Sequence, residues 1–251
     1  MDMEDRSHSG KIYVIGIGPG DGLMMTGQAV EALRSCDVVA GYKVYIDLIR
    51  DVIAGKEVIE SGMRQEIDRC EKSLKLAKDG KIVALVCSGD AGVYGMASPM
   101  LEIAEREGFS DVEIIPGVTA ALSGAAMLGA PIGHDFCVIS LSDLLTPWDL
   151  IKKRIRLACE ADLCIVLYNP ASRNRSEYLK KACEVMLTIL PAARPCGYAK
   201  NIGRSMSKTG VCALSELGDI DADMTTTVFV GNSRTYISGC RLITPRGYTI
   251  K

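Results

Sequence analysis

The chain has 251 residues, of which 48% are hydrophobic and 24% are charged, as in an ordinary globular protein. This length accommodates one large domain or two smaller ones, each with its own core. The net charge is −2 and the lysines and arginines are scattered, which argues against a nucleic acid as partner.

Membrane and metal proteins are disfavoured as well. The longest uncharged segment, 114–134, is rich in glycine and alanine and contains two prolines, so no membrane span is expected. The first ten residues are polar and charged, unlike a signal peptide. The ten cysteines include no C-x-x-C pair, so we expect no metal or iron–sulfur site. A reducing cytoplasm is the simplest setting for these thiols.

The first half of the sequence alternates short apolar runs with segments of helical composition. Strands are predicted over 12–17, 38–41, 55–59, 81–87 and 112–115, and helices over 26–35, 65–78, 99–107 and 120–128. Such alternation predicts an α/β fold with a parallel sheet, whose carboxyl-end loops gather along one edge.

The second half repeats this alternation without repeating the sequence. Strands are predicted over 136–139, 163–168, 196–199 and 225–230, and helices over 148–159 and 177–190. Small residues dominate 120–133, which is typical of a packed junction. We therefore predict two α/β domains, 11–120 and 121–251.

Three predicted strands of the first half end in glycine-rich loops. These read Gly16-Ile17-Gly18-Pro19-Gly20-Asp21, Ser88-Gly89-Asp90 with Tyr94-Gly95, and Ile115-Pro116-Gly117 with Thr119-Ala120. The first loop fails as a dinucleotide fingerprint, because Asp21 replaces the third glycine and Pro19 lacks an N–H donor for a pyrophosphate. A Gly-Pro-Gly turn suits a flat or neutral ligand group that approaches bare backbone.

These loops, together with Val228-Phe229-Val230-Gly231, resemble those of the tetrapyrrole methylases. These enzymes use S-adenosylmethionine to methylate precorrins and uroporphyrinogen, and the resemblance extends from Lys11 to about Tyr236. Four further segments are similar to the branch that methylates C-17 of a precorrin-3-type tetrapyrrole with ring contraction in cobalamin biosynthesis: 141–148, 167–170, 201–204 and 231–233.

The resemblance implies two α/β domains with S-adenosylmethionine in the cleft between them, and a homodimer. The residues that it assigns to the cofactor are Pro19, Ser88, Gly89, Asp90, Val93, Thr119, Ala120, Asn169 and Gly203. The substrate is either precorrin-3B or its cobalt-containing anaerobic counterpart. Abundant unpaired cysteines favour the cobalt form, although no residue decides between the two.

Ring contraction requires proton transfer, for which Asp90 and His134 are the candidate residues. Each also has a structural interpretation, since His134 can be a turn residue and Asp90 can hold its own loop through backbone hydrogen bonds.

The substrate carries many acetate and propionate groups, which guanidinium groups can pair in a bidentate way. Arg64 and Arg204 rank first as substrate-binding residues because each lies beside a glycine turn. Lys43, Arg173 and Arg175 are further candidates.

Two other functions stay open at this point. One is a related methylase that acts on another tetrapyrrole or, as diphthine synthases do, on a protein side chain. The other is a non-catalytic module that binds S-adenosylmethionine.

Overall fold

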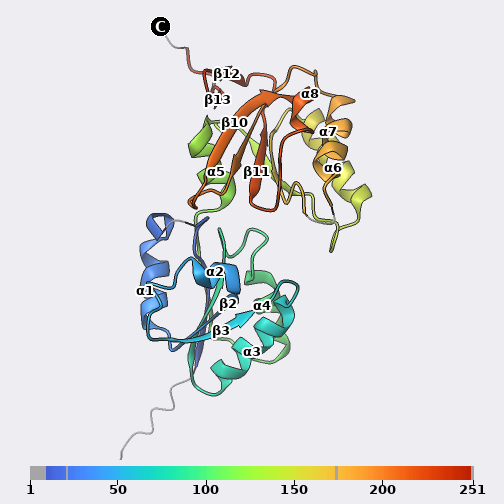
Figure 1. The fold of residues 1–251 in the computed structure, drawn as a ribbon. Coiled ribbons are helices and arrows are strands. Elements are labelled where there is room, and N and C mark those ends of the chain that lie inside the picture. The colour runs from blue at the N-terminus through green and yellow to red at the C-terminus, as the bar shows by residue number, and fades with distance from the viewer. Residues whose placement is uncertain (1–9, 21, 173–174, 250–251) are drawn as a thin grey trace, which may run out of the picture. The chain divides into compact units, whose positions relative to one another are not determined.

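The computed structural model describes residues 10–20, 22–172 and 175–249. The chain divides into two compact units, Met1–Thr119 and Ala120–Lys251, while the sequence places the boundary after residue 120. Figure 1 shows a β-sheet with helices beside it in each unit.

Unit 1 is built on a five-stranded sheet in the order β3-β2-β4-β1-β5, and every strand pair is parallel. Its strands are β1 (Lys11–Gly16), β2 (Val38–Tyr42), β3 (Glu57–Ser61), β4 (Ile82–Cys87) and β5 (Val112–Ile115). Its helices are η1 (Gly22–Met24), α1 (Gly27–Ser35), α2 (Lys43–Asp47), α3 (Glu66–Lys78) and α4 (Ala97–Arg106). The parallel sheet predicted for this half is confirmed.

Both faces of this sheet are covered, which explains its nearly continuous apolar strands. Successive side chains of a strand point to opposite faces. Val14 accordingly packs in the core beneath α3 and α4, while Ile15 packs in the core beneath α1 and α2. Thr26 caps the start of α1, where its side chain accepts a hydrogen bond from the N–H of Ala29.

Unit 2 contains a mixed sheet in the order β10-β9-β11-β8-β7, in which only β7 and β8 pair in parallel. Its strands are β7 (Phe136–Ser140), β8 (Cys164–Tyr168), β9 (Pro195–Lys200), β10 (Lys208–Ala213) and β11 (Thr226–Val230). A small second sheet joins β6 (Gly129–Ala130), β12 (Tyr236–Ser238) and β13 (Arg241–Ile243).

Helices flank the main sheet of unit 2 on two sides. The larger core lies under α6 (Trp148–Glu160), α7 (Tyr178–Leu187) and α8 (Leu214–Leu217). On the other face, α5 (Ala120–Leu128) packs so closely that a Cβ on Gly124 would lie 3.0 Å from the ring of Phe229. The small residues of α5 therefore permit this close packing.

Candidate active site

The glycine-rich loops of unit 1 meet at one edge of its sheet, because they follow the carboxyl ends of the neighbouring parallel strands β4, β1 and β5. The first two loops are joined directly. Gly18 N–H donates to the carbonyl of Gly89 (3.0 Å), and Gly89 N–H donates to the carbonyl of Gly18 (2.7 Å). The Ser88 hydroxyl also donates to the Gly18 carbonyl at 3.5 Å.

Gly16 and Gly117 allow the loops to pack backbone against backbone. A Cβ on Gly117 would lie 2.1 Å from the Gly89 carbonyl oxygen and 2.5 Å from that of Gly16. A Cβ on Gly16 would lie 2.6 Å from the same Gly89 oxygen. Since real Cβ atoms do not approach an oxygen so closely, this part of the site requires bare backbone.

Asp90 holds two of these loops together. One carboxylate oxygen accepts hydrogen bonds from the N–H groups of Gly92 (2.8 Å) and Val93 (3.2 Å). The other oxygen accepts from Gly117 N–H at 2.9 Å. The Asp90 carboxylate thus closes its own loop and fastens the loop after β5, which is the structural role considered for it above.

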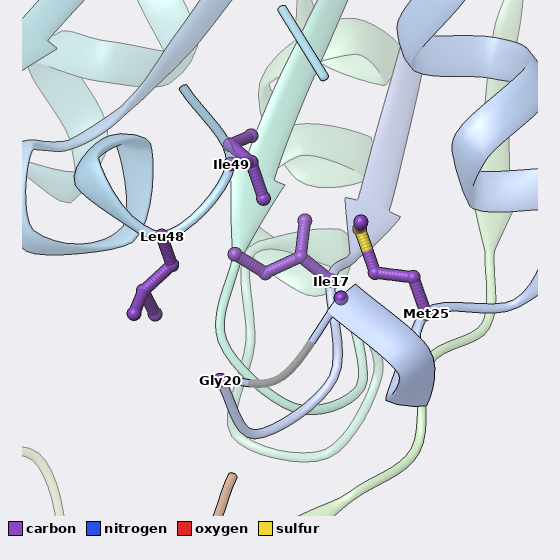
Figure 2. A pocket seen from close by; sticks show the side chains of 6 residues that line it. Ile17, Gly20, Met25, Leu48 and Ile49 are labelled. Carbon is purple, nitrogen blue, oxygen red and sulfur yellow. The ribbon is translucent and has the colours of Figure 1, made fainter. Parts of the chain in front are cut away.

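A small apolar depression lies beside the first loop. Its lining residues are Ile17, Gly20, Gly22, Met25, Leu48 and Ile49, and Figure 2 shows the side chains of Ile17, Met25, Leu48 and Ile49 beside the loop. Pro19 is buried next to it. This surface offers apolar contact next to backbone groups, and none of its described lining residues is a cation that could pair a phosphate.

In unit 2, the predicted residue Asn169 directly follows β8. Its backbone has a positive φ of 53°, and its side-chain amide donates to the Ser140 hydroxyl at 2.9 Å, at the end of the parallel strand β7. The Tyr168 hydroxyl accepts from Ala121 N–H (2.6 Å), which ties β8 to the start of α5 beside Ala120.

Gly203 lies at the same edge of this sheet as Asn169. Strands β8 and β9 both pair antiparallel with β11, and Val228 of β11 pairs with Leu167 of β8 and with Tyr198 of β9. The two strands therefore run in the same direction and end at the same side of the sheet. The turn after β9 contains Gly203 with φ of 66°, and Arg204 N–H closes the turn on the Asn201 carbonyl at 2.9 Å. The structure therefore brings these two predicted cofactor residues to one edge.

His134 lies at the opposite edge of that sheet. It precedes β7, whose last residue, Ser140, pairs with Tyr168, so about 20 Å of strand separates His134 from the level of Asn169. The side chain is 44% exposed, and its Nδ1 accepts a hydrogen bond from Asp135 N–H. This is the environment of a turn residue.

The two predicted substrate arginines differ in environment. Arg64 is exposed in the turn between β3 and α3, with φ of 64°, whereas Arg204 is half-buried. Asp21 of the first loop and the further candidate Arg173 lie outside the described residues.

Two other arginines have ordered environments: Arg69, which the sequence analysis did not single out, and Arg175, which it ranked below Arg64 and Arg204. Arg69 of α3 is 4% exposed and donates to the Ser61 hydroxyl, the Gly62 carbonyl and the Met96 sulfur, with no carboxylate within ion-pair distance among the described residues. Arg175 contacts Ser142, Asp143 and Ser172. The spacing of apolar residues indicates which side of α3 is buried, but no local pattern in the sequence predicts the hydrogen-bond partners of Arg69 or Arg175.

The cysteines are mostly buried. Burial raises the pKa of the Cys70 and Cys183 thiols to about 12, so both are protonated at neutral pH. Within the described ranges, no three His, Cys, Asp or Glu side chains are close enough to hold a metal ion. No helix of the described part of the chain is long and apolar enough to cross a membrane.

Comparison with known proteins settles the family. Residues 11–218 match the Tetrapyrrole (Corrin/Porphyrin) Methylases. The chain belongs to this family. It is similar to the probable cobalt-factor III C(17)-methyltransferase of Salmonella typhimurium, with 47% identity over 240 residues that cover 95% of this chain and all of the relative.

Other members agree with this assignment. The precorrin-3B C(17)-methyltransferase of Sinorhizobium is 40% identical, with 91% of each chain covered. The cobalt-factor III methyltransferase of Priestia megaterium is 41% identical over 96% of this chain, which spans 46% of that longer protein. Among solved structures, the methyltransferase CobJ superposes with a TM-score of 0.88 at 35% identity, covering 94% of this chain and all of CobJ. The predicted family and its fold class, two α/β domains, are confirmed.

Proposed function

We propose that this methylase transfers a methyl group from S-adenosylmethionine to C-17 of a precorrin-3-type tetrapyrrole, with ring contraction, in cobalamin biosynthesis. The full-length similarity to the Salmonella typhimurium protein, at 47% identity, carries this proposal. We favour cobalt-factor III as substrate. Three relatives named for cobalt-factor III are 47%, 43% and 41% identical to this chain, whereas the relative named for precorrin-3B is 40% identical.

The residues of the glycine loops fit S-adenosylmethionine. This molecule carries no phosphate, so it needs no cation at the first loop. It also needs no backbone N–H donor at Pro19, which has none. Gly16 and Gly117 let the loops pack backbone against backbone, because neighbouring backbone atoms occupy the space that a Cβ would fill. The lining of the apolar depression beside Ile17 offers apolar contact to the adenosine.

The residues that we propose to contact S-adenosylmethionine are Pro19, Ser88, Gly89, Asp90, Val93, Thr119, Ala120, Asn169 and Gly203. S-adenosylmethionine supplies an electrophilic methyl group, whose in-line transfer to carbon needs accurate positioning more than acid or base assistance. The chain contributes to this by holding its loops rigidly, through the paired backbones of Gly18 and Gly89 and the Asp90 carboxylate.

Ring contraction requires proton transfer in addition to methyl transfer. We propose that Asp90 acts by positioning the loops, because its carboxylate already accepts three backbone N–H groups. His134 lies at the sheet edge opposite to Asn169, so we propose no direct contact between His134 and the reacting atoms. Contraction by a His134→Ala variant at the wild-type rate is the expected result, and accumulation of a methylated, uncontracted product would restore His134 as the proton donor.

We further propose that the protein is a cytoplasmic homodimer, following the family expectation. Sedimentation equilibrium of the purified chain tests the dimer, and a mass equal to one chain at micromolar concentration would refute it.

The experiment that tests the function is an anaerobic incubation with S-adenosylmethionine and either cobalt-factor III or precorrin-3B. Mass spectrometry should show the gain of one methyl group with the cobalt form at the higher rate. Faster transfer to precorrin-3B would reverse the substrate assignment, and transfer to neither would refute the proposed reaction.

A further inference from the structure

Unit 2 holds one arginine side chain in a preset orientation. Arg175 Nη1 donates to the Ser142 hydroxyl at 2.6 Å and lies 3.5 Å from a carboxylate oxygen of Asp143. Its Nε donates to the Ser172 hydroxyl at 3.1 Å. The side chain is only 16% exposed, which distinguishes Arg175 from a freely moving surface arginine such as Arg64.

The Asp143 carboxylate is itself fixed by a second residue. The Tyr178 hydroxyl donates to the carboxylate oxygen that Arg175 does not approach, and the Tyr178 ring packs edge-on against Trp148 at 5.0 Å between centroids. The hydrogen bond from Tyr178 lowers the pKa of Asp143. Asp143 therefore stays ionised at neutral pH and keeps its charge beside Arg175.

One side of the Arg175 guanidinium is left unused. Among the described residues, none accepts a hydrogen bond from Nη2, while Nε and Nη1 are occupied. A guanidinium presents its N–H groups in a planar fork that matches the two oxygens of a carboxylate. Nη2 is thus the part of the fork that is available to an incoming anion.

The location links this arginine to a proposed cofactor residue. Ser142 N–H donates to the Ser140 hydroxyl (3.2 Å), which also accepts from the side-chain amide of Asn169 (2.9 Å). A short chain of hydrogen bonds therefore connects Asn169 to Arg175 at the carboxyl ends of β7 and β8. An anion bound at Nη2 would lie at the same sheet edge as Asn169.

We propose that Arg175 binds a side-chain carboxylate of the tetrapyrrole substrate, and that Asp143 and Tyr178 are positioning residues that hold its guanidinium. The inference rests on the proposed function, which supplies a substrate rich in acetate and propionate groups. It places the substrate anchor on a preoriented, mostly buried arginine rather than on the exposed Arg64.

The test compares Arg175→Ala, Arg175→Lys and Tyr178→Phe with Arg154→Ala, a control on the exposed face of α6. Loss of a charged hydrogen bond predicts a KM for cobalt-factor III about 10- to 100-fold higher in Arg175→Ala, with unchanged affinity for S-adenosylmethionine by calorimetry. Arg175→Lys should fall in between, and added guanidinium ion should lower the KM of Arg175→Ala. The control should match wild type.

A pH profile separates positioning from simple structural support. Without the Tyr178 hydroxyl, the pKa of Asp143 rises toward its ordinary value, so Asp143 loses its charge at a higher pH than in wild type. The KM ratio of Tyr178→Phe to wild type should therefore grow as the pH falls from about 5 toward about 3, the range in which an ordinary aspartate takes up its proton. A ratio that stays constant over this range would remove Asp143 and Tyr178 as positioning residues.

Two outcomes would overturn the assignment of Arg175. One is a KM within about twofold of wild type in Arg175→Ala or, if that variant does not fold, in Arg175→Lys. The other is a loss of S-adenosylmethionine affinity parallel to the change in KM. Failure of the proposed function is distinguishable, because the wild-type protein would then transfer no methyl group at all. Uroporphyrin III, an octacarboxylate, then serves as the probe, and its affinity by fluorescence titration must fall in Arg175→Ala if the assignment is correct.

Discussion

At the scale of single residues, Asp90 has the most sharply defined role. Its two carboxylate oxygens accept three backbone N–H groups from two loops. Charge-assisted hydrogen bonds of this kind are each worth about 1.5–3 kcal/mol in mutational series. A residue in this position organises the ligand loops whether or not it touches the ligand.

Asp90→Asn tests that role, because it keeps the shape and replaces one acceptor oxygen with an N–H₂ donor. We expect a loss of about 1–3 kcal/mol in the free energy of unfolding and a weaker affinity for S-adenosylmethionine. Chemical denaturation and calorimetry measure the two effects, with the exposed Asp51→Asn as control. Unchanged stability and affinity combined with a lower kcat would instead make Asp90 a proton donor or acceptor.

At the scale of elements, the loop between β1 and α1 depends on Gly18. Its backbone has φ of 73°, and a Cβ there would lie 2.7 Å from the Met24 carbonyl oxygen. Gly55 has a similar φ of 80°, but no atom lies within 4 Å of the position that its Cβ would occupy. A substitution at Gly55 therefore measures the free-energy cost of the left-handed backbone without a steric clash.

Gly18→Ala should therefore destabilise the protein by more than Gly55→Ala, for which the left-handed backbone alone costs about 1–2 kcal/mol. Gly18→Ala should also weaken binding of S-adenosylmethionine, while Gly55→Ala should leave it unchanged. Thermal unfolding and calorimetric titration of both variants provide the comparison. Equal effects of the two substitutions would contradict the close packing of this loop.

The sequence predicts those strands and loops that have a characteristic pattern of neighbouring residues. The apolar strands of unit 1 and the glycine loops after them follow from composition and spacing, and the structure has them where expected. Helix α2 was not predicted, because its five residues include Val44, Tyr45 and Ile46, which favour strands. Strand β10 was not predicted either, since it contains Gly210 and none of its residues is fully buried, and its pairing with β9 supports it.

The hydrogen bonds that orient the site residues join positions far apart in the sequence, so they could not be predicted from it. The hydrogen bond of Tyr178 to Asp143 spans 35 residues, and that of Arg175 to Ser142 spans 33. Neither pair has a characteristic spacing, so composition alone ranks Arg175 with other surface charges. The antiparallel pairing of β9 with β10 likewise depends on how the short turn 201–207 reverses the chain, which a count of alternating strands and helices does not reveal.

At the scale of the whole molecule, the ten cysteines provide a further test. Burial raises the pKa of thiols in both units, to about 12 for Cys70 and Cys183 and about 11 for Cys137 and Cys212, whereas Cys240 is exposed. Because the thiolate is the reactive form, iodoacetamide at pH 8 should label Cys240 first in the native protein. Peptide mass mapping identifies the site, and early labelling of Cys70 or Cys183 would contradict the buried environments described above.

The position of the transferred methyl group on the macrocycle decides whether this protein methylates C-17. Wild-type protein is incubated anaerobically with cobalt-factor III and S-adenosylmethionine labelled with ¹³C in its methyl group, and the product is examined by NMR. We expect a single labelled methyl group on C-17 of a contracted macrocycle. A labelled methyl group on any other carbon, or an unlabelled tetrapyrrole from protein that binds S-adenosylmethionine, would contradict this expectation.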